Sequence, residues 1–325
     1  MIAFLCVSHP AAACDLCAIY TGSLMQQDKT GLWLAIGEQY TNFNTIRVDG
    51  DKVANPDNEW IHSSITQLLV GHTITRRFGV QMNIPLISRE YRRVEDGVPT
   101  RGDVGGLGDI SILVRAIPYS GLVGSALVHT ELLAGIKTPT GDGDRLAEEL
   151  PEEDAAEDHL RTRVPRHAGH EEHDEEESAV HGHDLALGSG SADGLFAASG
   201  HASWKRLFLD GAAQYAVRGN GDFHYEFADD LTWESGLGVY ALAEDRYTAS
   251  IAFVTSGETK GKDHQLGIKA DDTSITAVYV GPAVTFTWST HLHADFACDL
   301  PVLQNETEKQ IVADYRLRAG LVWRF

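Results

Sequence analysis

The sequence predicts an all-β fold, an up-and-down antiparallel transmembrane β-barrel of about 12 strands. Three observations lead to this prediction. The C-terminal stretch alternates strictly between apolar and other residues, strand-like segments are joined by alternately short and long connections, and many segments pair an apolar face with a charged one. The length of 325 residues allows one large β domain or two ordinary ones.

The last stretch, 311–325, has a period of two. Its eight odd-numbered positions, from Ile311 to Phe325, are all apolar, whereas several even-numbered ones are charged. This period is typical of a β-strand, and the apolar face is longer than a usual strand of about 5–6 residues. A terminal strand that ends in Phe resembles the recognition signal of outer-membrane barrels. We therefore expect the barrel assembly machinery as a partner and the odd-numbered set as the lipid face.

The composition excludes several classes of protein. A formal net charge of −21 at pH 7 argues against nucleic acid as a partner, because phosphate binding needs a basic surface. No apolar run reaches the roughly 18 residues of a membrane-spanning helix. A mean hydropathy of −0.19 is compatible with a barrel, whose strands are apolar at alternate positions only. We expect the bacterial outer membrane as the location and its lipid as a partner.

The N-terminal part is expected to lie outside the barrel. Residues 1–13 resemble the apolar and cleavage regions of a secretory signal peptide, with three alanines before a cut at Cys14. Lipidation of Cys14 stays open. Residues 14–30 are then a periplasmic segment that carries the C-x-x-C pair of Cys14 and Cys17. A local disulfide and a redox or metal role are the alternatives, and the absence of a His after Cys17 excludes a c-type haem site.

The barrel is expected to span 31–325, with twelve strand-like segments. They are 31–46, 60–75, 78–92, 106–118, 122–138, 192–204, 206–218, 222–239, 246–257, 274–287, 290–303 and 311–325. The connections after the second, fourth, sixth, eighth and tenth segments are short, and the others are longer except for Gly219 to Gly221. Bacterial barrels alternate in this way between periplasmic turns and external loops, which places 138–191 outside the cell.

The polar face of the segments is the expected lining of the lumen. It is too charged for the packed centre of a soluble sandwich, where unpaired ions are costly. The spacing of histidines and carboxylates on 290–303 suits a cation path, and a hydrogen-bonded network is the alternative. The six tryptophans lie near segment ends, as in an aromatic girdle. The lumen-lining candidates are Asp109, Arg115, His129, Glu131, His291, His293, Asp295, Asp299, Arg316 and Arg318.

The long insertion at 139–190 is predicted to be a disordered extracellular loop. Within 141–184 there are sixteen acidic residues and four arginines, a composition that buries too little apolar surface to fold alone. Imidazoles and carboxylates together bind Zn²⁺ or Cu²⁺, so the loop is a candidate for metal capture, and a merely solvated acidic loop is the alternative. No cofactor is required. The candidate ligands are His159, His167, His170, His173, His181 and His183.

Several segments resemble one known family. They are Gly106 to Tyr119, Lys137 to Asp142, Gly188 to Ala198, Val278 to Trp288 and Asp299 to Phe325. Together they are similar to the outer-membrane proteins grouped as the MetA-pathway of phenol degradation family, often described as transporters. The resemblance implies a membrane barrel that moves small hydrophobic or aromatic compounds. It supplies no catalytic motif, and it does not cover the C-x-x-C pair or the His-rich insertion.

The sequence favours transport over catalysis. It contains no G-x-S-x-G, Walker A or H-E-x-x-H pattern, so no enzyme is expected. The favoured function is an outer-membrane channel that passes a small solute, with the His-rich loop capturing divalent metal. A transporter of small hydrophobic or aromatic compounds is one alternative. A non-conducting sleeve or binding protein for a periplasmic redox partner, contacted through Cys14 and Cys17, is another.

Overall fold

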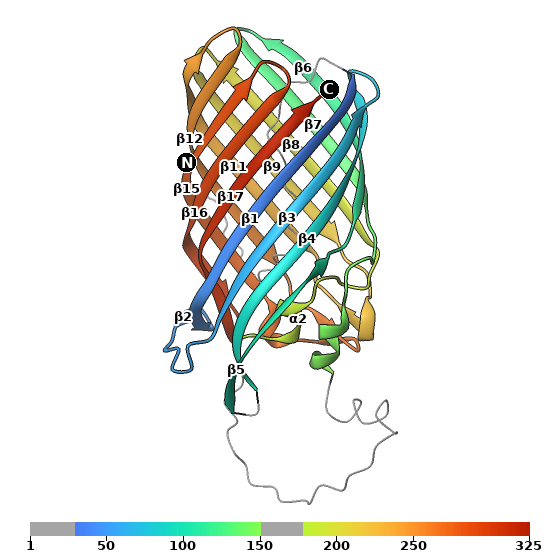
Figure 1. The fold of residues 1–325 in the computed structure, drawn as a ribbon, viewed down its shortest axis with the longest axis vertical. Coiled ribbons are helices and arrows are strands. Elements are labelled where there is room, and N and C mark those ends of the chain that lie inside the picture. Colours follow the sequence, from blue (N-terminus) through green and yellow to red (C-terminus); the bar gives the residue numbers. More distant parts are fainter. Residues whose placement is uncertain (1–29, 96, 151–177) are drawn as a thin grey trace, which may run out of the picture.

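The structure, a computed structural model, describes residues 30–95, 97–150 and 178–325. Its long strands run antiparallel to their neighbours, and β1 pairs with β17, so that the sheet closes into a barrel (Figure 1). In this part of the chain the wall has twelve strands. They are β1 (Gly31–Val48), β3 (Trp60–Thr73), β4 (Phe78–Glu95), β6 (Ser111–Val123), β7 (Ala126–Lys137), β8 (Asp193–Trp204), β9 (Leu207–Val217), β11 (Asp230–Ala243), β12 (Tyr247–Lys260), β15 (Ile275–Trp288), β16 (Leu292–Glu306) and β17 (Lys309–Arg324).

The two ends of the barrel differ. At the turn end, connections of two to four residues join the strands, as at 74–77 and 124–125. At the loop end, which includes the connection 138–192, the longer connections carry all the small elements (lower part of Figure 1). These are β2 (Asp51–Lys52), β5 (Val98–Leu107), η2 (Asp144–Glu149), α2 (Gly182–Leu185), η3 (Asp222–His224), β10 (Tyr225–Glu226), β13 (His264–Gln265), β14 (Ile268–Lys269) and η4 (Asp271–Thr273). No helix of the described ranges is long and apolar enough to cross a bilayer.

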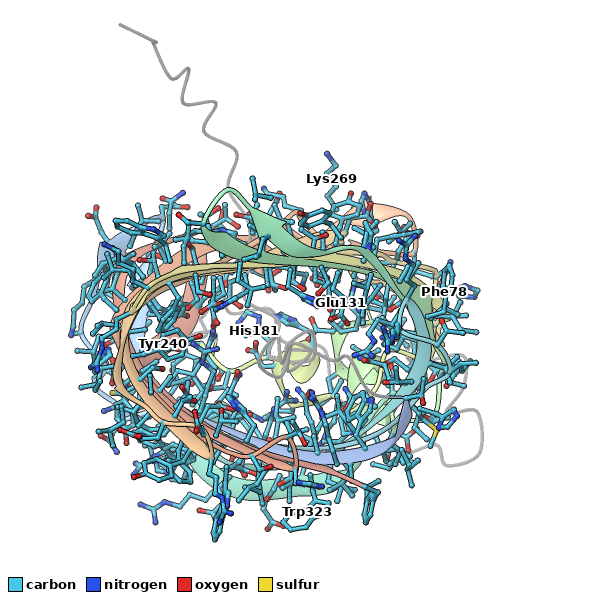
Figure 2. The ribbon with its side chains drawn as sticks, turned by 90° about the horizontal axis from the view of Figure 1, so that it is seen from above. Phe78, Glu131, His181, Tyr240, Lys269 and Trp323 are labelled. Atoms are coloured by element: carbon cyan, nitrogen blue, oxygen red, sulfur yellow. The ribbon has the colours of Figure 1, made fainter. Side chains whose placement is uncertain are left out.

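The alternation of side chains along the strands separates a lipid face from a lumen face. Phe78 and Trp323 point outward and Glu131 points into the ring (Figure 2). Along β4, outward residues from Phe78 to Leu86 are apolar, and the inward ones include Gln81 and Asn83, both buried. A period of two in the sequence places every second residue on the same face of a strand, and the two faces seen here follow that pattern. The predicted fold class, an antiparallel β-barrel of about 12 strands, is confirmed.

One tryptophan departs from the predicted girdle. Trp204, Trp288 and Trp323 are exposed at the turn end, but Trp33 is buried inside the barrel. It packs with Ala35, Leu69 and Val322. Its even-numbered neighbours Leu32 and Leu34 face outward instead. The position of a residue in the alternation of β1, and not its type, determines which face it occupies.

Two predicted strand boundaries are wrong. The segment 222–239 begins as η3 and β10, and the wall strand β11 starts only at Asp230. Phe223 and His224 have φ values of 54° and 57°, in the left-handed region. These two residues therefore cannot be part of an extended strand. The segment 106–118 is likewise divided. Its first residues belong to β5, which pairs with the outer half of β4, and β6 starts at Ser111.

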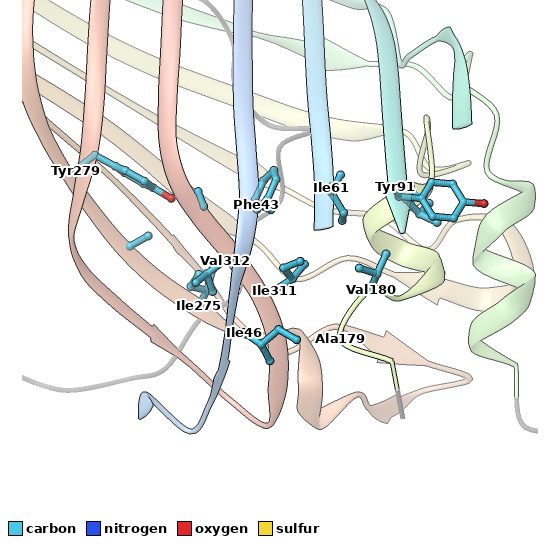
Figure 3. Packing of buried hydrophobic residues seen from close by; sticks show 13 residues of the cluster. Phe43, Ile46, Ile61, Tyr91, Ala179, Val180, Ile275, Tyr279, Ile311 and Val312 are labelled. Carbon is cyan, nitrogen blue, oxygen red and sulfur yellow. The ribbon is translucent and has the colours of Figure 1, made fainter. Parts of the chain in front are cut away.

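The predicted lipid face of the last strand is also wrong at its beginning. Ile311 and Ala313 are buried with Val312 in a cluster at the loop end (Figure 3). The register between β1 and β17 shifts twice around Phe43, and such a bulge changes which residues share a face. The ladder between β16 and β17 ends at Asp299 and Arg316, and the backbone N–H of Ile311 donates instead to the carbonyl oxygen of Ala179 (3.1 Å).

The prediction of disorder for 139–190 is wrong at both ends of that insertion. Residues 138–150 and 178–192 fold into the barrel mouth, where six of their apolar side chains are buried: Leu146, Ala179, Val180, Leu185, Ala186 and Leu187. We call these two segments the plug. The high charge that predicts disorder is an average over the whole insertion. The two ends of the insertion carry short apolar runs that are buried against the strands. The middle, 151–177, lies outside the described residues.

The main hydrophobic cluster joins the plug to the wall. Ala179, Val180 and Leu185 pack with side chains of β1, β3, β4, β15 and β17 (Figure 3). Tyr91 and Tyr279 are among these partners, and each is about 5% exposed or less. Burial of this apolar surface, at roughly 25 cal/mol per Å², helps to hold the plug in the barrel mouth.

Candidate functional site

A cavity of about 220 Å³ lies in the lumen. Its walls come from eight consecutive strands of the closed sheet, which are β3, β1, β17, β16, β15, β12, β11 and β9. Many of the lining residues are glycine and alanine, which leaves room next to the backbone. The charged inward-facing residues around it are Asp210, Glu234, Glu258, Asp295, Asp299, Arg316 and Arg318. Five carboxylates therefore face two guanidinium groups, which gives the cavity a negative balance.

Two arginines of β17 hold these carboxylates. Arg318 Nε donates to Asp299 Oδ2 (2.7 Å), and its Nη1 donates to Glu234. Because β11 and β17 are separated by three strands of the sheet, the bond to Glu234 spans part of the lumen. Arg316 Nη2 donates to Glu258 Oε1 (3.0 Å) and lies over the ring of Tyr279. Ordered ion pairs thus cross part of the lumen.

A second polar group lies nearer the turn end. The guanidinium of Arg115 is 3.5 Å from the carboxylate of Glu131, and His129 Nε2 is 4.0 Å from the same group. On the other side, His293 Nδ1 is 3.0 Å from Thr287 Oγ1, and its Nε2 is 3.7 Å from Asp295. These candidates face inward as expected, in two groups on different strands.

One lumen candidate is misplaced. His291 lies in the turn between β15 and β16, before the strand begins, and its side chain is exposed. Its backbone N–H bonds to the carbonyl oxygen of Trp288 in that turn. The separation of two residues from His293 predicted that both side chains share a face. Residues two apart share a face only within a strand, and His291 lies in the turn before the strand begins.

A buried polar cluster at the loop end attaches the plug. Lys137 Nζ contacts the carboxylates of Asp109 (2.8 Å) and Asp193 (2.7 Å) and donates to Ser189 Oγ. Arg218 extends the cluster from Asp193 to Asp230. Burial acts to raise the pKa of Asp109, but Lys137 outweighs it and holds this pKa below its usual range. Three of the segments that carry the family resemblance therefore meet here, those with Asp109, Lys137 and Asp193.

The histidines predicted as loop ligands divide into two groups. His159, His167, His170 and His173 lie outside the described residues, as do Cys14 and Cys17. His181 and His183 are part of the plug and not of an exposed loop. His181 lies within the ring in Figure 2, next to Asp272 of η4. His183 is 8% exposed and contacts Glu149.

Charge surrounds the two plug histidines. Burial would lower the pKa of His183, but the charges of Asp184 and Glu149 outweigh it and raise this pKa to about 10. Conversely, burial would raise the pKa of Glu149, and His183 lowers it to about 2. The pKa of Asp272 is likewise lowered to about 2, against burial, by the bond from His181. The carboxylates of Asp184, Glu149 and Asp272 therefore stabilise positive charge on the two histidines.

Sequence reasoning missed several inward residues. Glu234 belongs to a strand whose start was placed eight residues too early, and Glu258 lies just past the predicted end of its segment. Lys137 was on the predicted polar face but was not selected, because a single lysine near a strand end carries no local signal. Only the fold shows that it lies between two carboxylates.

Comparison with known proteins supports the fold. No family model and no curated protein matches the chain. Among solved structures, an outer membrane channel from Pseudomonas putida F1 is similar, with a TM-score of 0.61 and 13% identity over 92% of this chain and 97% of that one. The β domain of the Bordetella autotransporter Brka matches with a TM-score of 0.43 and 10% identity, over 92% of this chain and 100% of that one. A likeness at this identity concerns the fold, and this chain folds as a closed twelve-stranded antiparallel β-barrel, the architecture of that outer membrane channel.

Proposed function

We propose that this barrel is a channel or transporter that passes a small solute across the outer membrane. The observation that carries the proposal is the charged lumen, which holds a cavity of about 220 Å³ beside the Arg318–Glu234 ion pair. Twelve strands lie between the filled barrels of about eight strands and the open ones of about sixteen. The fold shared with the Pseudomonas putida channel agrees with this proposal.

Planar-bilayer conductance of the refolded protein tests the proposal. We expect small, discrete conductance steps, because ordered side chains narrow the lumen. Arg318→Ala removes the long side chain that reaches Glu234 and so widens the lumen. The conductance steps of this variant should be about twofold larger than those of the parent. Arg77→Ala, in an exposed turn, is the matched control and should leave the steps unchanged. Absence of steps from folded protein would contradict a channel and favour the non-conducting sleeve.

A transporter of small hydrophobic or aromatic compounds is the second candidate. Ile65, Phe208 and Val254 line the same cavity, so an apolar solute has a surface to contact there. The resemblance to the phenol-degradation family agrees with this candidate. Uptake of a radiolabelled monoaromatic compound into protein-containing vesicles, compared with uptake of a sugar of similar size, separates the two. Equal rates would argue against the aromatic preference.

We also propose that the acidic, His-rich part of the insertion draws divalent metal to the barrel. His159, His167, His170 and His173 supply imidazoles among many carboxylates, the ligand types that Zn²⁺ and Cu²⁺ accept. Micromolar Zn²⁺ should then shift the conductance steps when it is added on the side of this segment. A variant with these four residues changed to Gln should lose the shift, and an unchanged shift would contradict the role of the segment.

A further inference from the structure

We propose that His181, His183 and Asp272 form a binding site for one divalent transition-metal ion of the Zn²⁺ class, which ties the plug to the wall-side loop of η4. The site is separate from the four histidines of 151–177 and needs none of them. It also stands whether or not the barrel conducts, since it concerns how the barrel mouth is held together.

The three ligands come from segments far apart in the sequence. His181 and His183 flank the start of α2, and Asp272 lies in η4, just before β15. One ligand atom from each residue can be chosen so that all three lie within 4.8 Å of one another. In a tetrahedral zinc site with bonds of about 2.0–2.1 Å, ligand atoms are roughly 3.4 Å apart. The more distant ligand atoms would therefore move together by up to about 1.4 Å, and the closest pair, at 2.6 Å, would move slightly apart.

Hydrogen bonds already prepare both imidazoles as ligands. His181 Nε2 donates to the carbonyl oxygen of Ser178 (2.7 Å), and Nδ1 lies 2.6 Å from Asp272, so loss of the Nδ1 proton would free this nitrogen for a metal ion. His183 Nδ1 is 3.1 Å from Glu149, and its Nε2 points toward Asp184 at 3.6 Å. Metal-binding histidines typically donate their other N–H to a carbonyl or carboxylate in this way.

A fourth ligand is at hand. Asp184 accepts the backbone N–H of His181 through Oδ2 (3.0 Å), which fixes its carboxylate beside the two rings and leaves Oδ1 next to His183. Two imidazoles and two carboxylates make a set that suits Zn²⁺ better than Mg²⁺ or Ca²⁺, which prefer oxygen alone. Zinc binding would displace the protons that the two imidazoles share with their carboxylate partners, and the divalent cation would then offset the charge of Asp184, Asp272 and Glu149.

The surroundings are rigid enough to hold an ion. His183 is 8% exposed, and the ring of Tyr225 stacks on it at 6.2 Å. A Cβ atom added at Gly182 would lie 2.4 Å from the carbonyl oxygen of Arg145, so α2 packs directly on η2. The two histidine rings are nearly perpendicular, at 84° with centroids 5.3 Å apart, which lets their nitrogens converge from different directions.

Equilibrium zinc binding to the full-length barrel in detergent tests the site, with a competing chromophoric chelator as the reporter. One variant carries His159→Gln, His167→Gln, His170→Gln and His173→Gln, and we expect it to keep one tight zinc per chain. In that background, His181→Gln with His183→Gln should weaken this zinc at least 100-fold. Asp272→Asn keeps the shape of the side chain and should weaken it at least tenfold. Glu149→Gln, which alters only the partner of a ligand, should weaken it about 10–100-fold.

The zinc-binding experiment has a matched control in the same loop. Asp271→Asn changes the neighbouring carboxylate, which pairs with Lys262, and should leave zinc affinity within twofold of the parent. Circular dichroism of each variant checks that the barrel is folded. If the four-histidine variant binds no tight zinc, or if Asp272→Asn and the His181/His183 change both leave its affinity unaltered in folded protein, the proposed site is wrong. Neither result bears on the conductance test of the proposed function.

Discussion

Arg318 bridges two carboxylates of the lumen that belong to different strands. Its guanidinium group bonds Asp299, whose side chain is 1% exposed, and Glu234 on the far side of three strands. Removal of one partner of a buried ion pair leaves the other charge without compensation, which is costlier than loss of the whole pair. Arg318 therefore affects both the width of the lumen and the stability of the barrel.

Arg318→Ala should lower the free energy of unfolding by about 3 kcal/mol, because Asp299 becomes an unpaired buried charge. Arg318→Ala with Asp299→Asn should recover at least half of that loss. Urea unfolding in detergent, followed by tryptophan fluorescence, measures both, with the exposed Arg77→Ala as the control at about 0.5 kcal/mol or less. A double variant no more stable than the single one would show that Asp299 is not the charge left unpaired.

At the scale of elements, the plug is attached by polar and apolar contacts together. Lys137 at the end of β7 binds Asp109 and Asp193, while Ala179 and Val180 pack into the hydrophobic cluster. Neither set is local in sequence: the residues 109 and 193 are far apart and meet only in the closed barrel. The plug should therefore loosen when its polar attachment is cut, even with the apolar contacts intact.

Lys137→Met should make the plug sensitive to protease, because two carboxylates lose a common cation at a cost of about 3–5 kcal/mol. Limited proteolysis, with cleavage sites identified by mass spectrometry, should show new cuts within 138–150 and 178–192. Lys262→Met, at an exposed ion pair, is the matched control and should give the cleavage pattern of the parent. An unchanged pattern for Lys137→Met would mean that the apolar cluster holds the plug without this lysine.

The elements also show how far the sequence could lead. The period of two in 78–92 gave the correct face for each side chain, because no bulge interrupts that strand. In 311–325 the same reasoning failed at Ile311 and Ala313, because a register shift around Phe43 is not encoded in the alternation of one strand. The plug was missed for a similar reason. Its short apolar runs have little meaning until a barrel mouth exists for them to bury against.

At the scale of the whole molecule, one closed sheet separates lipid from lumen. Leu237 and Phe253 are 64% and 59% exposed on the outer face, a large exposure for apolar side chains that only a bilayer makes favourable. The inward face carries the ion pairs described above. Net charge and hydropathy alone do not reveal this division, because they average over both faces.

Leu237→Arg should destabilise the barrel in lipid vesicles by about 2–4 kcal/mol, since a charged side chain would then face the bilayer. Val53→Arg, in a loop beyond the end of the wall, is the control and should cost about 0.5 kcal/mol or less. Reversible urea unfolding in vesicles measures both. Equal small effects would contradict the assignment of the outer face.

The reversal potential in a KCl gradient across a planar bilayer tests whether the solute passes through the acid-lined lumen. Five inward carboxylates and two arginines line the cavity, so we expect the parent protein to prefer cations over anions. Asp210→Asn with Asp295→Asn should reduce that preference several-fold while the steps remain. Anion preference in the parent, or a reversal potential that the double variant leaves unchanged, would contradict a path through this cavity.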